Sequence, residues 1–142
     1  MKKISNEDVK TLEDLYKKNN LNELEKKTKK LLKIQDDNII LLNILGVTYL
    51  KKESFKEAEN IFKKLLGKNS KDFNALKNLG ETYRKTKKFT NAIKYYELYL
   101  KINPKDNEII NNLASSYLKN KKYKLETSYY ENLCELKPDN EE

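Results

Sequence analysis

One stretch of twelve residues recurs three times along the chain at a fixed spacing of 34 residues. The copies read ILGVTYLKKESF at 44–55, NLGETYRKTKKF at 78–89 and NLASSYLKNKKY at 112–123. Four positions in phase with this stretch keep their residue type: Leu42, Leu76 and Ile110; Leu45, Leu79 and Leu113; Gly46, Gly80 and Ala114; Tyr49, Tyr83 and Tyr117. A period of this length is typical of proteins that stack one supersecondary unit repeatedly.

Each repeat predicts a pair of helices. Leu76, Leu79 and Tyr83 have the spacing of one helical face, and Ala92, Tyr96 and Tyr99 have that spacing again after a short polar break. A helix pair cannot bury its apolar face alone, so the repeats must stack. The predicted helices are 6–18, 21–34, 39–52, 55–67, 73–86, 90–102, 107–120 and 123–136, and Ser5 with Asp8 and Ser54 with Glu57 have capping-box spacing.

The recurring positions resemble the tetratricopeptide repeat, whose 34-residue pattern combines Leu, Gly and Tyr with a later Ala–Phe–Ala and a Pro. The resemblance covers repeats at 39–72, 73–106 and 107–140 and a degenerate repeat at 5–38, although the family's Trp is absent. It implies an all-α fold, a right-handed α-solenoid of about four stacked helix-turn-helix repeats. We expect residues 1–142 to form one such domain.

Composition argues against an enzyme. The chain has no histidine, only three glycines and a single cysteine, Cys134, which leaves no evident general base, phosphate loop or metal-ligand spacing. We therefore expect no catalytic residue, no metal and no cofactor. No apolar run approaches the roughly 20 residues of a membrane span, and a cytoplasmic location is the expectation.

The resemblance implies that the first helix of each pair lines a concave groove that binds a protein or peptide partner. The residues of those helices left over after packing are the candidate peptide-binding set: Asn43, Asn74, Lys77, Asn78, Glu81, Arg84, Asn111, Asn112 and Ser115. Asparagine side chains both donate and accept hydrogen bonds, which suits the backbone of an extended peptide. The predicted function is a non-catalytic interaction module.

The helix predicted at 39–52 is apolar almost all round, and two interpretations of it stay open. Ile40, Ile44 and Val47 are either an apolar groove floor for a partner, or they are covered by the first helix, with Val9, Leu12, Leu15 and Tyr16. The sequence favours the second interpretation, because a helix of this kind is usually buried on both sides.

A lysine recurs with the same period at the end of each first helix: Lys17, Lys51, Lys85 and Lys119. Lysine near a helix C-terminus is favoured by the helix dipole, which accounts for these positions. The alternative is a basic edge that binds nucleic acid or an anionic surface, in line with a net charge of +8. Only one basic residue, Arg84, is an arginine, which does not favour a dedicated nucleic-acid binder.

Two further expectations concern the C-terminal end. The array stops after a complete repeat without an evident capping helix, so an alternative is the N-terminal repeat segment of a longer bacterial protein of glycosyltransferase or sulfotransferase type. Apolar side chains of the last predicted helix form an exposed stripe that predicts a weak homodimer: Tyr123, Leu125, Tyr130, Leu133 and Leu136.

Overall fold

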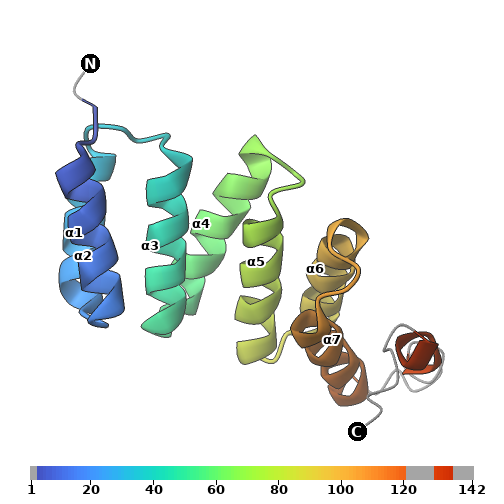
Figure 1. The fold of residues 1–142 in the computed structure, drawn as a ribbon. Coiled ribbons are helices and arrows are strands. Elements are labelled where there is room, and N and C mark those ends of the chain that lie inside the picture. The colour runs from blue at the N-terminus through green and yellow to red at the C-terminus, as the bar shows by residue number, and fades with distance from the viewer. Residues whose placement is uncertain (1–2, 121–129, 136–142) are drawn as a thin grey trace, which may run out of the picture. The chain divides into compact units, whose positions relative to one another are not determined.

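The computed structural model describes residues 3–120 and 130–135, and its regular elements there are all α-helices (Figure 1). The named helices are α1 (Asn6–Lys17), α2 (Leu21–Leu32), α3 (Ile39–Lys51), α4 (Phe55–Lys68), α5 (Phe73–Lys85), α6 (Phe89–Ile102) and α7 (Asn107–Lys119). Residues 130–135 are also helical. The boundaries of the named helices lie within two residues of those predicted from the repeat, and the all-α prediction is confirmed.

The first helix of each pair begins at a capping side chain. Ser5 accepts a hydrogen bond from the backbone of Asp8, whose carboxylate accepts from the Ser5 backbone, which is the predicted capping box. The side chains of Asn38, Asp72 and Asp106 cap α3, α5 and α7 by accepting from the backbone N–H three residues on. Local sequence therefore sets where these helices start.

The capping box predicted at Ser54 is wrong. Ser54 stands before α4, but its side chain makes no capping hydrogen bond. Its backbone N–H donates to the carbonyl of Tyr49 at 2.9 Å, and its ψ is 67° instead of the 158° found at Ser5. The tight turn after α3 therefore fixes the backbone of Ser54 in a conformation that no longer suits a cap.

The chain forms two compact halves, Met1–Asn78 and Leu79–Glu142. In the N-terminal half, α1 packs on α2, α2 on α3 and α3 on α4. One core cluster joins Leu12, Leu24, Leu31 and Leu41. Gly46 lets α4 approach α3 closely, because a Cβ at this position would lie 2.6 Å from the ring of Phe62.

In the C-terminal half, α6 packs on α7, and the same close approach recurs one repeat later. A Cβ on Gly80 would lie 2.7 Å from the ring of Tyr96, which is fully buried. The ring of Tyr83 stacks on Tyr95, with 5.6 Å between centroids. The packing role predicted for the repeat glycine is therefore confirmed.

The predicted apolar stripe near the C-terminus is partly wrong. Leu133 is only 6% exposed, whereas Tyr130 is 41% exposed. Leu133 therefore belongs to the core of its half and not to an exposed stripe. Tyr123, Leu125 and Leu136 lie outside the described residues.

Candidate peptide-binding groove

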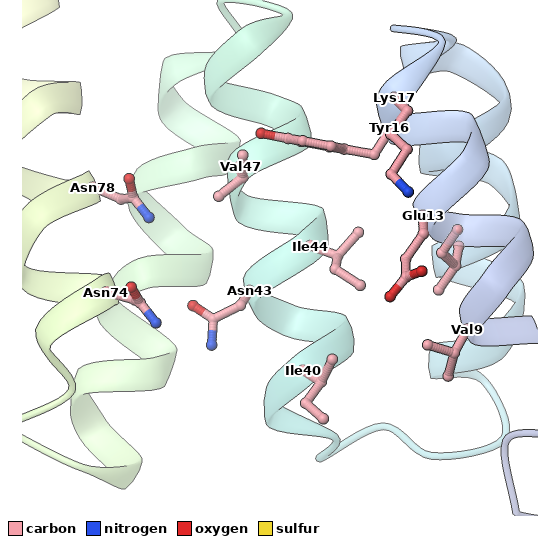
Figure 2. A pocket seen from close by; sticks show the side chains of 11 residues that line it. Val9, Glu13, Tyr16, Lys17, Ile40, Asn43, Ile44, Val47, Asn74 and Asn78 are labelled. Carbon is pink, nitrogen blue, oxygen red and sulfur yellow. The ribbon is translucent and has the colours of Figure 1, made fainter. Parts of the chain in front are cut away.

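A groove of about 600 Å³ opens on the N-terminal half (Figure 2). Three first helices supply its walls. From α1 come Val9, Leu12, Glu13, Tyr16 and Lys17; from α3, Ile40, Asn43, Ile44 and Val47; and from the start of α5, Asn74 and Asn78. We call this surface the N-terminal groove.

The structure shows that α1 covers α3 only in part: Leu12 and Leu15 share a core cluster with Leu41 and Ile44. Ile40 is 68% exposed and Val9 is 44% exposed, although each faces the other helix across the groove (Figure 2). The helix α1 packs mainly on α2, and Leu12 and Leu15 are the side chains it directs toward the core cluster. Ile40 and Val9 therefore stay open to solvent, whereas Ile44 and Val47 are half-buried.

The two long walls of the groove have matching spacing. Val9, Leu12, Glu13 and Tyr16 stand at i, i+3, i+4 and i+7 on α1, and Ile40, Asn43, Ile44 and Val47 repeat that spacing on α3. Seven residues of helix rise about 10.5 Å, so each wall presents two turns of side chains. The residues predicted as an apolar groove floor thus lie along one wall of the groove: Ile40, Ile44 and Val47.

The third wall is polar. Asn74 and Asn78 stand one helical turn apart on α5, and the amide of Asn43 points toward them from α3 (Figure 2). Asn43 donates from Nδ2 to the carbonyl of Ile39 at 3.1 Å, but its Oδ1 is buried without a hydrogen-bond partner among the described residues. An unpaired buried acceptor costs about 1–3 kcal/mol, and a donor from outside would reach this atom only if the side chains that cover it moved.

An aromatic contact stands at the C-terminal ends of α1 and α3. The Nζ atom of Lys51 lies 4.0 Å from the centroid of the Tyr16 ring, a cation–π contact between the two helices. Tyr16 itself lines the groove. Two of the periodic lysines, Lys17 and Lys51, therefore lie at this end of the groove.

A second hollow of about 380 Å³ shares Val9, Leu12, Ile40 and Ile44 with the groove. It adds residues near the start of α1 and α3: Lys3, Ile4, Gln35, Asn38 and Leu41. The shared aliphatic side chains make one continuous apolar trough between α1 and α3, which runs beyond the groove toward Lys3.

Two candidate residues of the C-terminal half are engaged within the protein. Arg84 donates to both carboxylate oxygens of Glu81, at 2.9 Å and 2.5 Å, and the hydroxyl of Tyr96 donates to the same carboxylate at 2.9 Å. Burial opposes ionisation of Glu81, but the hydrogen bonds from Arg84 and Tyr96 outweigh it and lower its pKa. Glu81 also raises the pKa of Arg84, so the pair stays charged.

The other candidate residues do not line the N-terminal groove. Asn111 is exposed, while Lys77, Asn112 and Ser115 are half-buried. Lys85 and Lys119 are the exposed last residues of α5 and α7, as the helix-dipole interpretation expects.

Sequence reasoning placed Leu12 correctly against α3, expected Val9 and Tyr16 to be covered as well, and missed Glu13. The signal was available, because Glu13 follows Val9 by one turn and must share its face. What the sequence did not show is which face of α1 stays uncovered.

The groove is suited to noncovalent recognition. Its lining combines aliphatic side chains, three amides, a carboxylate, an amine and a phenol. Across residues 3–120 and 130–135, no cluster of three or more His, Cys, Asp or Glu side chains could hold a metal ion. Over the same residues no helix combines the length and apolarity that crossing a membrane requires.

Comparisons with known proteins agree with this architecture. A family model described as Psidin, N-terminal TPR repeats region, matches residues 10–142. A solved tetratricopeptide repeat protein from Parabacteroides merdae ATCC 43184 is similar, with a TM-score of 0.82 and 20% identity over 95% of this chain and 54% of that one. No curated protein was found to match the sequence.

Two solved MamA proteins are similar as well. MamA from AMB-1 has a TM-score of 0.76 and 20% identity, over 86% of this chain and 67% of that one. The MamA fragment 41-end from Desulfovibrio magneticus RS-1 has a TM-score of 0.80 and 16% identity, over 90% and 72%. At these identities the similarity shows the fold, and the predicted helical-repeat class is confirmed.

Proposed function

Because the chain belongs to the tetratricopeptide-repeat family, we propose that it is a non-catalytic interaction module whose N-terminal groove binds a peptide or a helix of a partner protein. The division into repeats at 5–38, 39–72, 73–106 and 107–140 within one domain is part of this proposal. Stacked helix pairs of this kind bind by presenting side chains in a fixed arrangement, which lowers the ordering cost of association.

One observation carries the proposal: aliphatic side chains on two facing helices stay exposed in a groove whose third wall is a row of amides (Figure 2). Ile40 is 68% exposed, and Asn43 Oδ1 is buried and unpaired among the described residues. Apolar surface beside a positioned polar atom is the usual composition of a binding site. Binding of a partner would remove this aliphatic surface from water.

The peptide-binding set predicted from sequence spans several repeats and includes both Asn78 and Asn112. We propose instead that the N-terminal groove, which includes Asn78 but not Asn112, is the principal site. Glu81 and Arg84 support this choice, because a ligand would have to break their mutual hydrogen bonds before it could use either side chain.

Ile40→Asp tests the proposal, with Ile39→Asp as the matched control. Both residues are exposed isoleucines in the first turn of α3, but only Ile40 lines the groove and its neighbouring hollow. Partners captured by the purified wild-type protein should also be captured by Ile39→Asp and lost with Ile40→Asp. Circular dichroism should show both variants folded. Equal capture by the two variants would move the site away from this groove.

A further inference from the structure

We propose that the partner segment of the N-terminal groove is an acidic amphipathic helix, with aliphatic side chains on one face and carboxylates at both of its ends. This inference rests on the proposed function and adds the chemistry of the occupant. It follows from the shape of the apolar trough between α1 and α3 and from the charges at its two ends.

The shape of the trough favours a helix. The helices α1 and α3 run side by side in the same direction (Figure 1), and their groove-facing residues share the spacing i, i+3, i+4, i+7. Two such rows leave a furrow into which the side-chain ridge of a third helix packs, because all three have the same rise per turn. The aliphatic residues shared by both hollows, Val9, Leu12, Ile40 and Ile44, form the floor of that furrow.

Lysines stand at both ends of the trough. Lys3 lines its end near the start of α1, and Lys17, the last residue of α1, lines the other end. The twelve residues of α1 span about 18 Å, so the two amines are far enough apart to meet opposite ends of one helix. Neither lysine forms an ion pair with any residue that the structure describes, and Lys51 adds a third cation beside Tyr16.

The middle of the trough excludes a carboxylate. Glu13 is the single acidic residue that lines the groove, and its side chain points into it (Figure 2). A carboxylate of the partner at mid-length would be repelled by Glu13. The amide of Asn43 lies outside this trough, because it points from α3 toward Asn74 and Asn78 (Figure 2). The partner helix therefore carries aliphatic residues in its middle and its acids at the ends.

The charge of the whole chain supports an acidic partner. Its formal net charge is +8. A net positive field attracts an acidic segment during diffusion and repels a basic one, so it raises the association rate of the former.

Two designed peptides test the inference. Each is a capped helix with leucines at i, i+3, i+4 and i+7 and alanine elsewhere. One carries three glutamates at each end, and the other carries lysines in their place. Circular dichroism should show equal helicity. By fluorescence polarisation at physiological salt, the glutamate peptide should bind the full chain at least about tenfold more tightly than the lysine peptide.

Charge-reversal variants give the decisive comparison. Lys3→Glu with Lys17→Glu should abolish or invert the preference, weakening the glutamate peptide about tenfold. Lys10→Glu with Lys18→Glu is the matched control. It changes the net charge by the same amount, but its two exposed lysines lie in or next to α1 and line neither hollow. This control should weaken binding of the glutamate peptide less than about threefold.

Four outcomes would overturn the inference: equal binding of the two peptides, tighter binding of the lysine peptide, no binding of either peptide, or an equal effect of the two double variants. If the lysine peptide binds and Ile40→Asp removes it, the groove is a binding site for another chemistry and only this inference fails. If neither peptide binds, this inference also fails. The proposed function is then judged separately by the capture experiment with Ile39→Asp and Ile40→Asp.

Discussion

A methyl group on Gly80 would lie 2.7 Å from two ring carbons of Tyr96, closer than carbon atoms approach in folded proteins. Gly46 stands in the same relation to Phe62. The buried hydroxyls are a second residue-scale feature. Thr48 and Ser116 each donate to the carbonyl four residues earlier at 2.7 Å, so they fit the core without an unpaired donor.

We predict opposite effects of the same substitution at two glycines. Gly80→Ala should destabilise the protein by about 1–3 kcal/mol, because Tyr96 is buried and its ring must shift. Gly67→Ala should stabilise it by about 0.5–1 kcal/mol, because this glycine lies in α4 and an added methyl group would meet no neighbouring atom within 4 Å. Urea unfolding measures both. A Gly80→Ala variant as stable as wild type would show that the α5–α6 contact is looser than described.

At the scale of elements, the turns inside the helix pairs share one backbone geometry. Asn19, Glu53 and Lys87 have positive φ angles of 53°, 59° and 60° and follow one another at the repeat period. After each, a backbone N–H reaches back to a carbonyl five residues earlier, as in the Schellman motif; for Asn20 the acceptor is Leu15. Glutamate and lysine tolerate this conformation poorly, so the turn is maintained by the packing of the two helices it joins.

The start of α1 makes a pH-dependent contribution to stability. The ion pair with Lys27 at 2.9 Å and the hydrogen bonds from Ser5 lower the pKa of Asp8 to about 2, from an ordinary value of 3.8. The Asp8 carboxylate binds a proton more readily in the unfolded chain than in the folded one. Its contribution to folding stability is therefore present above about pH 4 and is lost as the pH falls toward 2.

We therefore predict that Asp8→Asn lowers the melting temperature at pH 6 but has little effect at pH 2. Thermal melts followed by circular dichroism across this range measure the difference. Asp14→Asn, at an exposed position of the same helix, is the control. If the melting temperature of Asp8→Asn stays below that of wild type by the same amount down to pH 2, the ionised carboxylate is not the stabilising form.

At the scale of the whole molecule, charge opposes folding. The chain carries 30 basic and 22 acidic residues. Several ion pairs of the described residues are at least partly exposed, such as Lys63 with Glu59 and Lys68 with Asp37, and pairs of this kind stabilise by at most about 1 kcal/mol. Repulsion among the excess cations acts over longer distances and is screened by salt.

We predict that the melting temperature rises when the ionic strength is raised from about 10 mM to about 150 mM. The variant Lys10→Glu with Lys18→Glu halves the net charge from +8 to +4, so its melting temperature should rise less over the same interval. Sodium chloride should be used for both, and melts compared at one protein concentration. A fall in the wild-type melting temperature would mean that the ion pairs outweigh the net repulsion.

The sequence by itself determined the helices and their pairing. Helix formation depends on side chains three and four residues apart and on caps next to the helix, so Leu76, Leu79 and Tyr83 were enough to set the register of α5. The close contact at Gly80 was also predictable from sequence. A glycine that recurs at one position of the repeat indicates that a neighbouring helix approaches closely there.

Only the tertiary structure decided which surfaces stay open and which polar groups are already paired. The sequence of an apolar helix such as α3 does not indicate which of its faces is buried. Whether α1 covers Ile40 therefore depends on how closely the two helices approach. Tyr96 meets Glu81 only because α6 folds back on α5. These contacts join residues that neither periodicity nor capping relates, and they depend on the distances that packing sets between helices.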